Sequence, residues 1–169
     1  MTAILITGLP GQLTTALKNQ FSSNGISPDI TCFFTNRNQF DITNFEQCFE
    51  YLKNARPAIN YIVNCAAYTN VDGAETNQEE AHRINSAGPK NLSELANRFN
   101  IKLIHISTDY VFPEYSTTNQ PYTENDNTEP VNYYGLTKLE GEQNIINNFN
   151  NYLQICNLDL ICKYEIDNK

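Results

Sequence analysis

The sequence is poor in positive charge and in several residue types that mark particular classes of protein. It has no tryptophan, one methionine and two histidines, and 11 Lys and Arg stand against 19 Asp and Glu, a formal net charge of −8. This acidic balance, without a run of Lys or Arg, excludes the electrostatic footprint of a protein that binds nucleic acid or anionic membranes. No apolar run approaches the ~20 residues that span a bilayer, and no basic segment follows Met1, so neither a membrane span nor a signal peptide is predicted.

Cysteine is used in a pattern that excludes a disulfide framework. The five cysteines are odd in number and scattered, and none forms a Cys-x-x-Cys pair. They are typical of reduced thiols that fill apolar space, rather than of disulfides or a zinc site. His82 and His105 are too isolated to suggest a metal site. With 169 residues the chain is therefore predicted to be a soluble cytoplasmic domain, and the sequence points to no metal-ligating residues.

What the sequence does contain is a regular alternation of strand and helix patterns. Short apolar runs predict strands over residues 2–6, 30–34, 59–63, 101–106 and 152–161. Apolar residues at helical spacing predict helices over 13–25, from a capping box of Thr43 and Glu46 to Pro57, over 77–99 and over 132–150, with loops at 64–76 and 113–131. Such a pattern implies an α/β fold, a doubly wound parallel sheet covered on both faces, with ligands at the carboxyl ends of the strands.

The first strand is followed by a glycine-containing turn that opens the first helix. Its residues run Thr7-Gly8-Leu9-Pro10-Gly11-Gln12-Leu13-Thr14. Glycines at such a turn let the backbone approach a pyrophosphate, whose charge the helix N-terminus stabilises. Thr14 stands in the place of the third glycine of the usual dinucleotide-binding fingerprint, and its bulk is expected to loosen the helix against the sheet. The alternative is an ordinary two-glycine turn without a ligand.

The end of the second strand bears on which dinucleotide would bind. NAD-selective sites usually carry an acidic residue at this point, which bonds the ribose 2′-hydroxyl. Here the sequence reads Thr35-Asn36-Arg37, with a guanidinium and no carboxylate. We therefore expect NADPH, with Arg37 near its 2′-phosphate and NADH as the second candidate. The alternative is that Arg37 is a solvated surface residue.

A tyrosine and a lysine four residues apart follow the fourth strand. Tyr134 and Lys138 share one face of the predicted helix, and Thr108 closes the strand that precedes it. An ordinary tyrosine has a pKa near ~10, and a neighbouring ammonium lowers that pKa, which suits general acid–base catalysis. With ten tyrosines in the chain, one such pair can arise by chance. The pair gains its weight from the phosphate loop and the strand-end hydroxyl that accompany it.

These motifs belong to a longer series that runs in one order through residues 3 to about 153. On this series the chain resembles the extended short-chain dehydrogenase/reductases, and within them the dTDP-4-dehydrorhamnose reductases. The matching segments are Gly8-x-x-Gly11-Gln12-Leu13, Asp41-Ile42-Thr43, Asn64-Cys65-Ala66-Ala67-Tyr68-Thr69 with Val71-Asp72 and Ala74-Glu75, Asn85-x-x-Gly88-Pro89-x-Asn91-Leu92, His105-Ile106-Ser107-Thr108-Asp109-Tyr110-Val111-Phe112, Pro121-Tyr122-x-Glu124, and Pro130-x-Asn132-x-Tyr134-Gly135-x-x-Lys138-x-x-Gly141-Glu142. The resemblance implies a Rossmann-type NAD(P)-binding domain.

The resemblance further implies an oxidoreductase of nucleotide-sugar biosynthesis. Enzymes of this family reduce the 4-keto group of dTDP-4-dehydro-6-deoxy-L-mannose to give dTDP-L-rhamnose, with hydride from the nicotinamide. It implies that Tyr134 protonates the developing alkoxide, and that Lys138 lowers the tyrosine pKa and bonds the nicotinamide ribose. Thr108 would polarise the substrate carbonyl, with Asp109 on the substrate side.

The same resemblance implies which residues contact the cofactor. In chain order they are Gly8, Gly11, Gln12 and Leu13 at the pyrophosphate, Asp41 and Ile42 at the adenine, and Ala67, Tyr68 and Thr69 at the ribose and nicotinamide. The alternative for Asp41 is a residue that only leads into the second helix.

The chain departs from the family after about Ile155. The family continues from the strand at Tyr152 with an Arg-Thr motif and soon a Trp, and this sequence has neither. We expect residues 1–153 to form the cofactor-binding domain, 154–169 to be a divergent tail, and the sugar-nucleotide-binding lobe to be missing. Because remote binding energy makes a reacting centre effective, we expect weak or no reductase activity from this chain alone. A homodimer, or another chain that supplies the lobe, would be the partner.

Two other functions stay open. One is a non-catalytic NADP-binding subunit that serves another enzyme, because the regulatory β subunit of methionine adenosyltransferase has this fold and similar motifs. The other is a decayed gene product without function. The intact set of Thr108, Tyr134 and Lys138 favours catalysis, with a nucleotide sugar as the expected substrate.

Overall fold

Five apolar segments form one parallel sheet. The structure, a computed structural model, describes residues 1–25, 27–114, 121–123 and 125–157. The sheet has the strand order β2-β1-β3-β4-β5, and each neighbouring pair is parallel. Its strands are β1 (Thr2–Leu9), β2 (Ile30–Asn36), β3 (Tyr61–Asn64), β4 (Lys102–Thr108) and β5 (Tyr152–Asn157). The predicted parallel α/β fold is thereby confirmed, whereas residues 158–161 of the last predicted strand lie outside the described residues.

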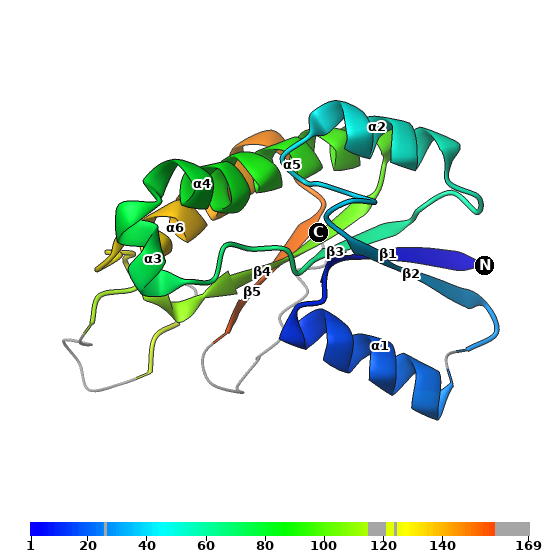
Figure 1. Cartoon of the computed structure of the whole chain (residues 1–169), viewed down its shortest axis with the longest axis horizontal. Helices are drawn as coiled ribbons and strands as arrows, with labels where there is room; N and C mark the ends of the chain where they lie inside the picture. Colours follow the sequence, from blue (N-terminus) through cyan, green and yellow to red (C-terminus); the bar gives the residue numbers. More distant parts are fainter. Residues whose placement is uncertain (26, 115–120, 124, 158–169) are drawn as a thin grey trace.

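Helices cover both faces of this sheet. They are α1 (Gln12–Asn24), α2 (Phe45–Asn54), α3 (Val71–Thr76), α4 (Gln78–His82), α5 (Gly88–Phe99) and α6 (Tyr133–Asn148). Helix α1 lies on one face, and α2, α4, α5 and α6 lie on the other (Figure 1). The carboxyl ends of β1, β2, β3 and β4 consequently meet at one edge, where the connecting segments leave the sheet.

The main core lies between the sheet and the face that carries α2, α5 and α6. Leu5, Ile62 and Leu103 point into it from the three central strands, and Leu92 and Leu95 reach it from α5. All five side chains are at most 1% exposed. Burying a side chain of this size contributes roughly 1.5–3 kcal/mol, so this face holds the strand ends in place.

Helix α2 begins one residue later than the capping box predicted. The Asn44 side chain, not that of Thr43, accepts the hydrogen bond from the backbone of Gln47, at 3.1 Å. Thr43 instead donates its hydroxyl to Asp41, at 2.7 Å. Asn is at least as good an N-cap as Thr. The Thr43 oxygen already accepts from Arg83, while its hydroxyl donates to Asp41. The capping box of Thr43 and Glu46 is therefore wrong.

The segment predicted as a loop followed by one long helix has more structure than expected. Helix α3 lies inside the predicted loop 64–76, where Asn70 caps it by accepting from Gly73, at 2.9 Å. The long helix itself is interrupted, because a π-helical turn over Arg83–Ala87 separates α4 from α5. Such turns are frequent at functional sites, and this one faces α6.

Three further findings concern the described residues. No helix among them is both long and apolar enough to cross a membrane. They contain no cluster of three or more His, Cys, Asp or Glu that could hold a metal ion. Cys32, Cys48 and Cys65 are free thiols.

The predicted loop 113–131 falls partly on residues 115–120 and 124, which lie outside the described residues.

Candidate functional site

A cavity of about 780 Å³ opens at the carboxyl edge of the sheet. Its volume lies within the range of small-molecule sites, roughly 300–1,000 Å³. Most of the predicted site residues line it: Gly8, Gly11, Gln12, Leu13, Arg37, Asp41, Ile42, Ala67, Thr69, Tyr134 and Lys138. Of the described residues predicted for the site, Tyr68, Thr108 and Asp109 do not line it. The fold thus joins the two ends of the sequence motif, which are more than a hundred residues apart, around one space.

The turn after β1 requires glycine at its first position. Gly8 has φ +95°, and a Cβ there would lie 2.8 Å from the carbonyl carbon of Cys65 and 2.9 Å from the nitrogen of Ala66. The turn closes through a hydrogen bond of 2.7 Å that Gly11 donates to the carbonyl of Gly8. Helix α1 starts directly afterwards, so its unsatisfied N–H groups lie beside the cavity.

Thr14 ties the first helix to the sheet. Its side chain is fully buried, and its hydroxyl donates a hydrogen bond of 2.9 Å to the carbonyl of Thr7 in β1. The expectation that Thr14 loosens the helix is therefore wrong. The bond gives the helix a direct link to the strand that a glycine could not make.

Beneath the cavity, buried polar side chains connect the three central strands. Thr7 donates to Asn64 at 2.8 Å, and the Asn64 amide donates to Nδ1 of His105 at 3.0 Å. The parallel register sets Asn64 opposite His105 on adjacent strands. Together with Thr14 these residues form what we call the buried polar strip. Ala66, which begins the next segment, donates its N–H to both Thr7 and Asn64, each at 3.3 Å.

His105 is neutral in this strip. Burial lowers the pKa of its imidazole well below the usual range, and the charge of Lys138 lowers it further. The ring is 1% exposed, and a neutral tautomer with its proton on Nε2 accepts the Asn64 amide at Nδ1. Nε2 has no hydrogen-bond partner among the described residues.

Tyr134 and Lys138 enter the cavity from the start of α6. Asn132 caps this helix by accepting from Gly135 at 2.7 Å, which sets Tyr134 in the first turn. Its ring packs edge-on against Tyr110, with the ring centroids 5.8 Å apart. Lys138 is 2% exposed and donates from Nζ to the carbonyl of Ile106 at 2.6 Å. Both functional groups therefore lie near the end of β4.

The electrostatics of Tyr134 differ from the prediction. Burial raises the pKa of its phenol, the hydrogen bond with Thr108 acts in the opposite direction, and the charge of Asp109 raises the pKa again. The pKa of the phenol is therefore raised in this structure and not lowered as predicted. The ammonium of Lys138 is bound to the Ile106 carbonyl, and its own effect on the tyrosine pKa stays a prediction. Thr108, although outside the cavity lining, is in contact with the phenol.

A buried asparagine that carried no predicted role positions the loop that contains Ala67, Tyr68 and Thr69. Asn85 lies in the π-helical turn and is 1% exposed. Its amide oxygen accepts from the N–H of Tyr68 at 2.8 Å, and its nitrogen donates to the carbonyl of Tyr68 at 3.1 Å and to the Thr137 hydroxyl at 3.2 Å. It thereby fixes Ala67 and Thr69 relative to α6. The sequence placed Asn85 in a segment that matches the family, but it did not show which residues Asn85 bonds.

Ser107 is another residue without a predicted role. It lines the cavity, and its hydroxyl donates to the buried carboxylate of Glu142 in α6. This contact links the end of β4 to the helix that carries Tyr134. Both residues occur in matching segments, so their presence was visible in the sequence and their pairing was not.

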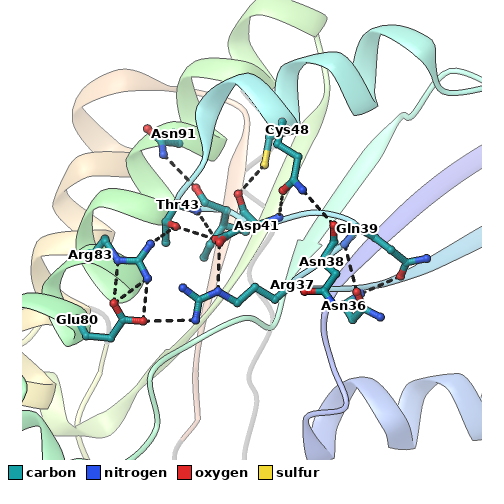
Figure 2. A network of polar contacts seen from close by, with 12 residues as sticks. Asn36, Arg37, Asn38, Gln39, Asp41, Thr43, Cys48, Glu80, Arg83 and Asn91 are labelled. Carbon is teal, nitrogen blue, oxygen red and sulfur yellow. Dashed lines mark hydrogen bonds and ion pairs between the residues drawn. The ribbon is translucent and has the colours of Figure 1, made fainter.

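At the other end of the cavity, charged groups form a closed circuit that we call the polar ring. Its members are Arg37, Asp41, Thr43, Glu80 and Arg83 (Figure 2). Arg37 donates from Nε to Asp41 at 3.1 Å and from Nη1 to Glu80 at 3.4 Å. Arg83 donates to Thr43 and Glu80, and Thr43 donates to Asp41, which completes the circuit. Arg37 is thus exposed over 57% of its side chain, yet paired with two carboxylates.

Asp41 is both a cavity residue and part of the entry to α2. Burial acts to raise the pKa of Asp41, but hydrogen bonds from Thr43 and Arg37 outweigh it and leave the pKa lowered. The carboxylate accepts from the backbone N–H of Thr43 at 3.0 Å, which shapes the turn before the helix. Asp41 can therefore lead into α2 and still face the cavity, so the two interpretations from the sequence, a cofactor contact and a helix entry, are compatible.

Comparison with known proteins shows which family the chain belongs to. The family model described as "RmlD substrate binding domain" matches residues 1–156. A dTDP-4-dehydrorhamnose reductase of Mycolicibacterium smegmatis is 40% identical over 143 residues, which is 85% of this chain and 41% of that protein. The enzyme of the same name from Aggregatibacter actinomycetemcomitans is 38% identical over 143 residues, 85% of this chain and 46% of the relative. The chain thus spans less than half the length of these curated relatives.

Solved structures show the same likeness. A dTDP-4-dehydrorhamnose reductase of Clostridium acetobutylicum superposes with a TM-score of 0.82 at 35% identity, covering 92% of this chain and 52% of that one. The Bacillus anthracis enzyme of that name, solved in complex with NADP, gives a TM-score of 0.80 at 34% identity, with 92% and 53% covered. The family match over nearly the whole chain, together with these relatives, confirms the resemblance: the chain belongs to the RmlD substrate binding domain family.

Proposed function

We propose that the cavity binds NADPH and that Thr108, Tyr134 and Lys138 serve the reduction of dTDP-4-dehydro-6-deoxy-L-mannose to dTDP-L-rhamnose. The observation that carries the proposal is the meeting of the glycine turn and the Tyr134–Lys138 pair around one cavity. The names of the relatives and the NADP in the Bacillus anthracis structure support the same conclusion. NADH is the second candidate cofactor.

The residues present fit a dinucleotide. A side chain at Gly8 would collide with the backbone of Cys65 and Ala66, so this turn keeps its tight shape only with glycine. The N-terminus of α1, which follows the turn, offers N–H groups for a pyrophosphate. In the proposed arrangement Gly11, Gln12 and Leu13 hold the pyrophosphate. Asp41 and Ile42 flank the adenine with Arg37 near the 2′-phosphate, and Ala67, Tyr68 and Thr69 border the ribose and nicotinamide.

The raised pKa of Tyr134 suits the role of a proton donor. Burial keeps the phenol protonated at neutral pH, so it can give its proton to a strongly basic alkoxide. When bound, the dinucleotide supplies the hydride for the carbonyl carbon. The Thr108 hydroxyl, which is close enough to the phenol to lower its pKa, is placed to orient the carbonyl oxygen beside it. Lys138, fixed on the Ile106 carbonyl, is positioned to bond the ribose.

The substrate-binding side of the site is the part of the proposal that the chain supports least, because the chain spans less than half the length of the relatives. Asp109 follows Thr108 and accepts its hydroxyl at 3.2 Å, which sets a carboxylate beside the reacting oxygen. The relatives contain a large portion without a counterpart in these 169 residues. Because remote contacts with a substrate contribute to rate, we propose that the 169-residue polypeptide binds the dinucleotide but turns over weakly unless a second chain contributes the rest of the substrate site.

The test combines binding with turnover. Fluorescence titration of the 169-residue polypeptide with NADPH should show saturable binding in the wild type and in Tyr134→Phe. NADPH consumption with the 4-keto sugar nucleotide, measured at high protein concentration, should fall by about 10²-fold or more in Tyr134→Phe, since the proton donor is lost. Tyr133→Phe is the matched control, because the adjacent ring is outside the cavity lining and only its backbone N–H bonds Glu75.

Three outcomes separate the alternatives. Failure to bind NADPH or NADH overturns the proposal. Turnover that survives in Tyr134→Phe removes that residue from the mechanism. Binding of NADPH without turnover, together with a stable partner enzyme, supports the non-catalytic subunit instead.

A further inference from the structure

Glu80 is the one member of the polar ring that contacts both arginines. It accepts from Nε and Nη2 of Arg83 at 2.8 and 2.7 Å, and from Nη1 of Arg37 at 3.4 Å. Figure 2 shows its carboxylate between the two guanidinium groups. Glu80 belongs to α4, whereas Arg37 belongs to the segment that follows β2. The ring therefore brings a carboxylate from a distant helix to the arginine at the rim of the cavity.

The ring is formally neutral, which bears on any anion that approaches it. Arg37 and Arg83 carry the positive charges, and Asp41 and Glu80 carry the negative charges. Arg37, Asp41 and Thr43 line the cavity, so a ligand that reaches this end meets an arginine already paired with two carboxylates. A phosphate monoester, with a charge of about −1.5 to −2 near pH 7, would share that guanidinium with both of them.

The two carboxylates are not held equally. Asp41 is fixed by the N–H and the hydroxyl of Thr43 as well as by Arg37, and it shapes the turn before α2. Glu80 is held by Arg83 in a two-pronged contact, and its contact with Arg37 is the longest in the ring. Removal of the Glu80 charge therefore leaves the turn intact and changes mainly the electrostatic field at Arg37.

We propose that Glu80 is a specificity-determining residue of the cofactor site, whose carboxylate competes with the 2′-phosphate of NADPH for Arg37 and so limits the preference for NADPH over NADH. The inference rests on the proposed function. Specificity is a difference of affinities, and a repulsive charge next to one ligand group is a common way to set it. The ribose 2′-hydroxyl of NADH carries no charge, so the affinity for NADH should not depend on the charge of Glu80.

The test compares Glu80→Gln with Glu79→Gln. Both variants remove one negative charge from α4, but Glu79 is exposed and outside the ring. Dissociation constants for NADPH and NADH are measured by fluorescence titration of the 169-residue polypeptide at low salt. In Glu80→Gln, NADPH should bind about three- to tenfold more tightly, with NADH within about twofold of the wild type, as expected for one charge at a half-exposed site.

Salt supplies a second readout that a structural role would not move. The gain for NADPH should shrink near 1 M salt, where the Debye length is about 3 Å, because the effect is electrostatic. In an Arg37→Gln background, Glu80→Gln should no longer favour NADPH, since the guanidinium for which the carboxylate and the phosphate compete is gone. Glu79→Gln should leave the ratio of the two constants unchanged.

The outcomes distinguish this inference from the function on which it rests. Equal changes for both dinucleotides, or weaker NADPH binding, would show that Glu80 only supports the loop and would overturn the inference alone. Binding of neither dinucleotide by the wild type would overturn the proposed function and the inference with it.

Discussion

Two polar networks border the same cavity, and they differ in charge and in contact with water. The buried polar strip joins β1, β3 and β4 through neutral groups that are at most 1% exposed. The charged side chains of the polar ring are 22–57% exposed. Each network links segments more than forty residues apart, the strip from Thr7 to Asn64 and the ring from Arg37 to Glu80.

Burial decides what each network contributes. Loss of one partner from an interior hydrogen bond leaves a desolvated group, at a cost of about 1–3 kcal/mol. An exposed ion pair is worth about 0–1 kcal/mol, because water and salt screen it. We therefore expect the strip to hold the strand ends at fixed positions, and the ring to adjust affinity for charged ligands with little effect on stability. Three predictions test this contrast.

The largest effect is expected where a new atom would push the strip apart. In Gly8→Ala, the added Cβ would press on the backbone of Cys65 and Ala66, and Ala66 donates its N–H to Thr7 and Asn64. Positive φ and crowding together should lower the free energy of unfolding by about 2–5 kcal/mol, as measured by urea denaturation.

A second glycine separates the two causes. Gly25 also has positive φ, +68°, but a Cβ there meets nothing within 4 Å. Gly25→Ala should therefore show only the conformational cost of about 1–3 kcal/mol. Equal losses in the two variants would mean that the contact with Cys65 and Ala66 is not tight.

The second effect is a pH dependence that comes from the strip. His105 is neutral when folded, with its pKa held down by burial, whereas the unfolded chain binds a proton below about pH 6.5. Unfolding therefore takes up a proton in acid, so the stability contributed by the neutral ring is complete above that pH and is lost as the pH falls towards the folded pKa. Between about pH 7.5 and 5.5 the free energy of unfolding should drop by about 1 kcal/mol.

The chain provides a matched control in its other histidine. His82 lies near Glu140 at the surface, with half of its side chain exposed. His105→Gln should remove most of the drop, and His82→Gln should keep it. The difference in slope between the two variants isolates the contribution of His105. An unchanged slope in His105→Gln would contradict a neutral ring in the folded state.

The smallest effect is expected in the ring. Arg83→Gln removes the contacts to Glu80 and Thr43, yet the free energy of unfolding should change by less than about 1 kcal/mol because these groups are half-exposed. A double-mutant cycle with Glu80→Gln measures the coupling of the pair directly. A coupling energy of about 2 kcal/mol or more, unaffected by salt, would place the ring with the strip as a structural element.

The sequence patterns predicted the strands and the placement of chemistry well, for a physical reason. Parallel strands place their carboxyl ends at one edge, so residues that follow β1, β2 and β4 were expected to meet there, and Gly11, Arg37 and Tyr134 do. The cap of α2 was harder to predict, because the Thr43 oxygen accepts from the distant Arg83 and the neighbouring Asn44 caps the helix instead.

Partners from distant segments lay beyond the reach of pattern reasoning. The sequence showed Thr14 as an oversized glycine substitute, but the Thr7 carbonyl that accepts its hydroxyl is known only once α1 is docked. It showed Lys138 one turn after Tyr134, but the ammonium bonds to Ile106 and burial dominates the tyrosine pKa. Local spacing predicts which side chains share a face, and tertiary contacts decide what they do there.

The central place of β1 in the sheet has a consequence for how the protein is made. Both neighbours of this strand, β2 and β3, are later in the chain, and the second is complete only at Asn64. At a translation rate of about 5–20 residues per second, the apolar stretch from Ile4 to Ile6 waits roughly 3–12 s for that neighbour. Until β3 has been made, the nascent strand can pair along one edge only, with β2.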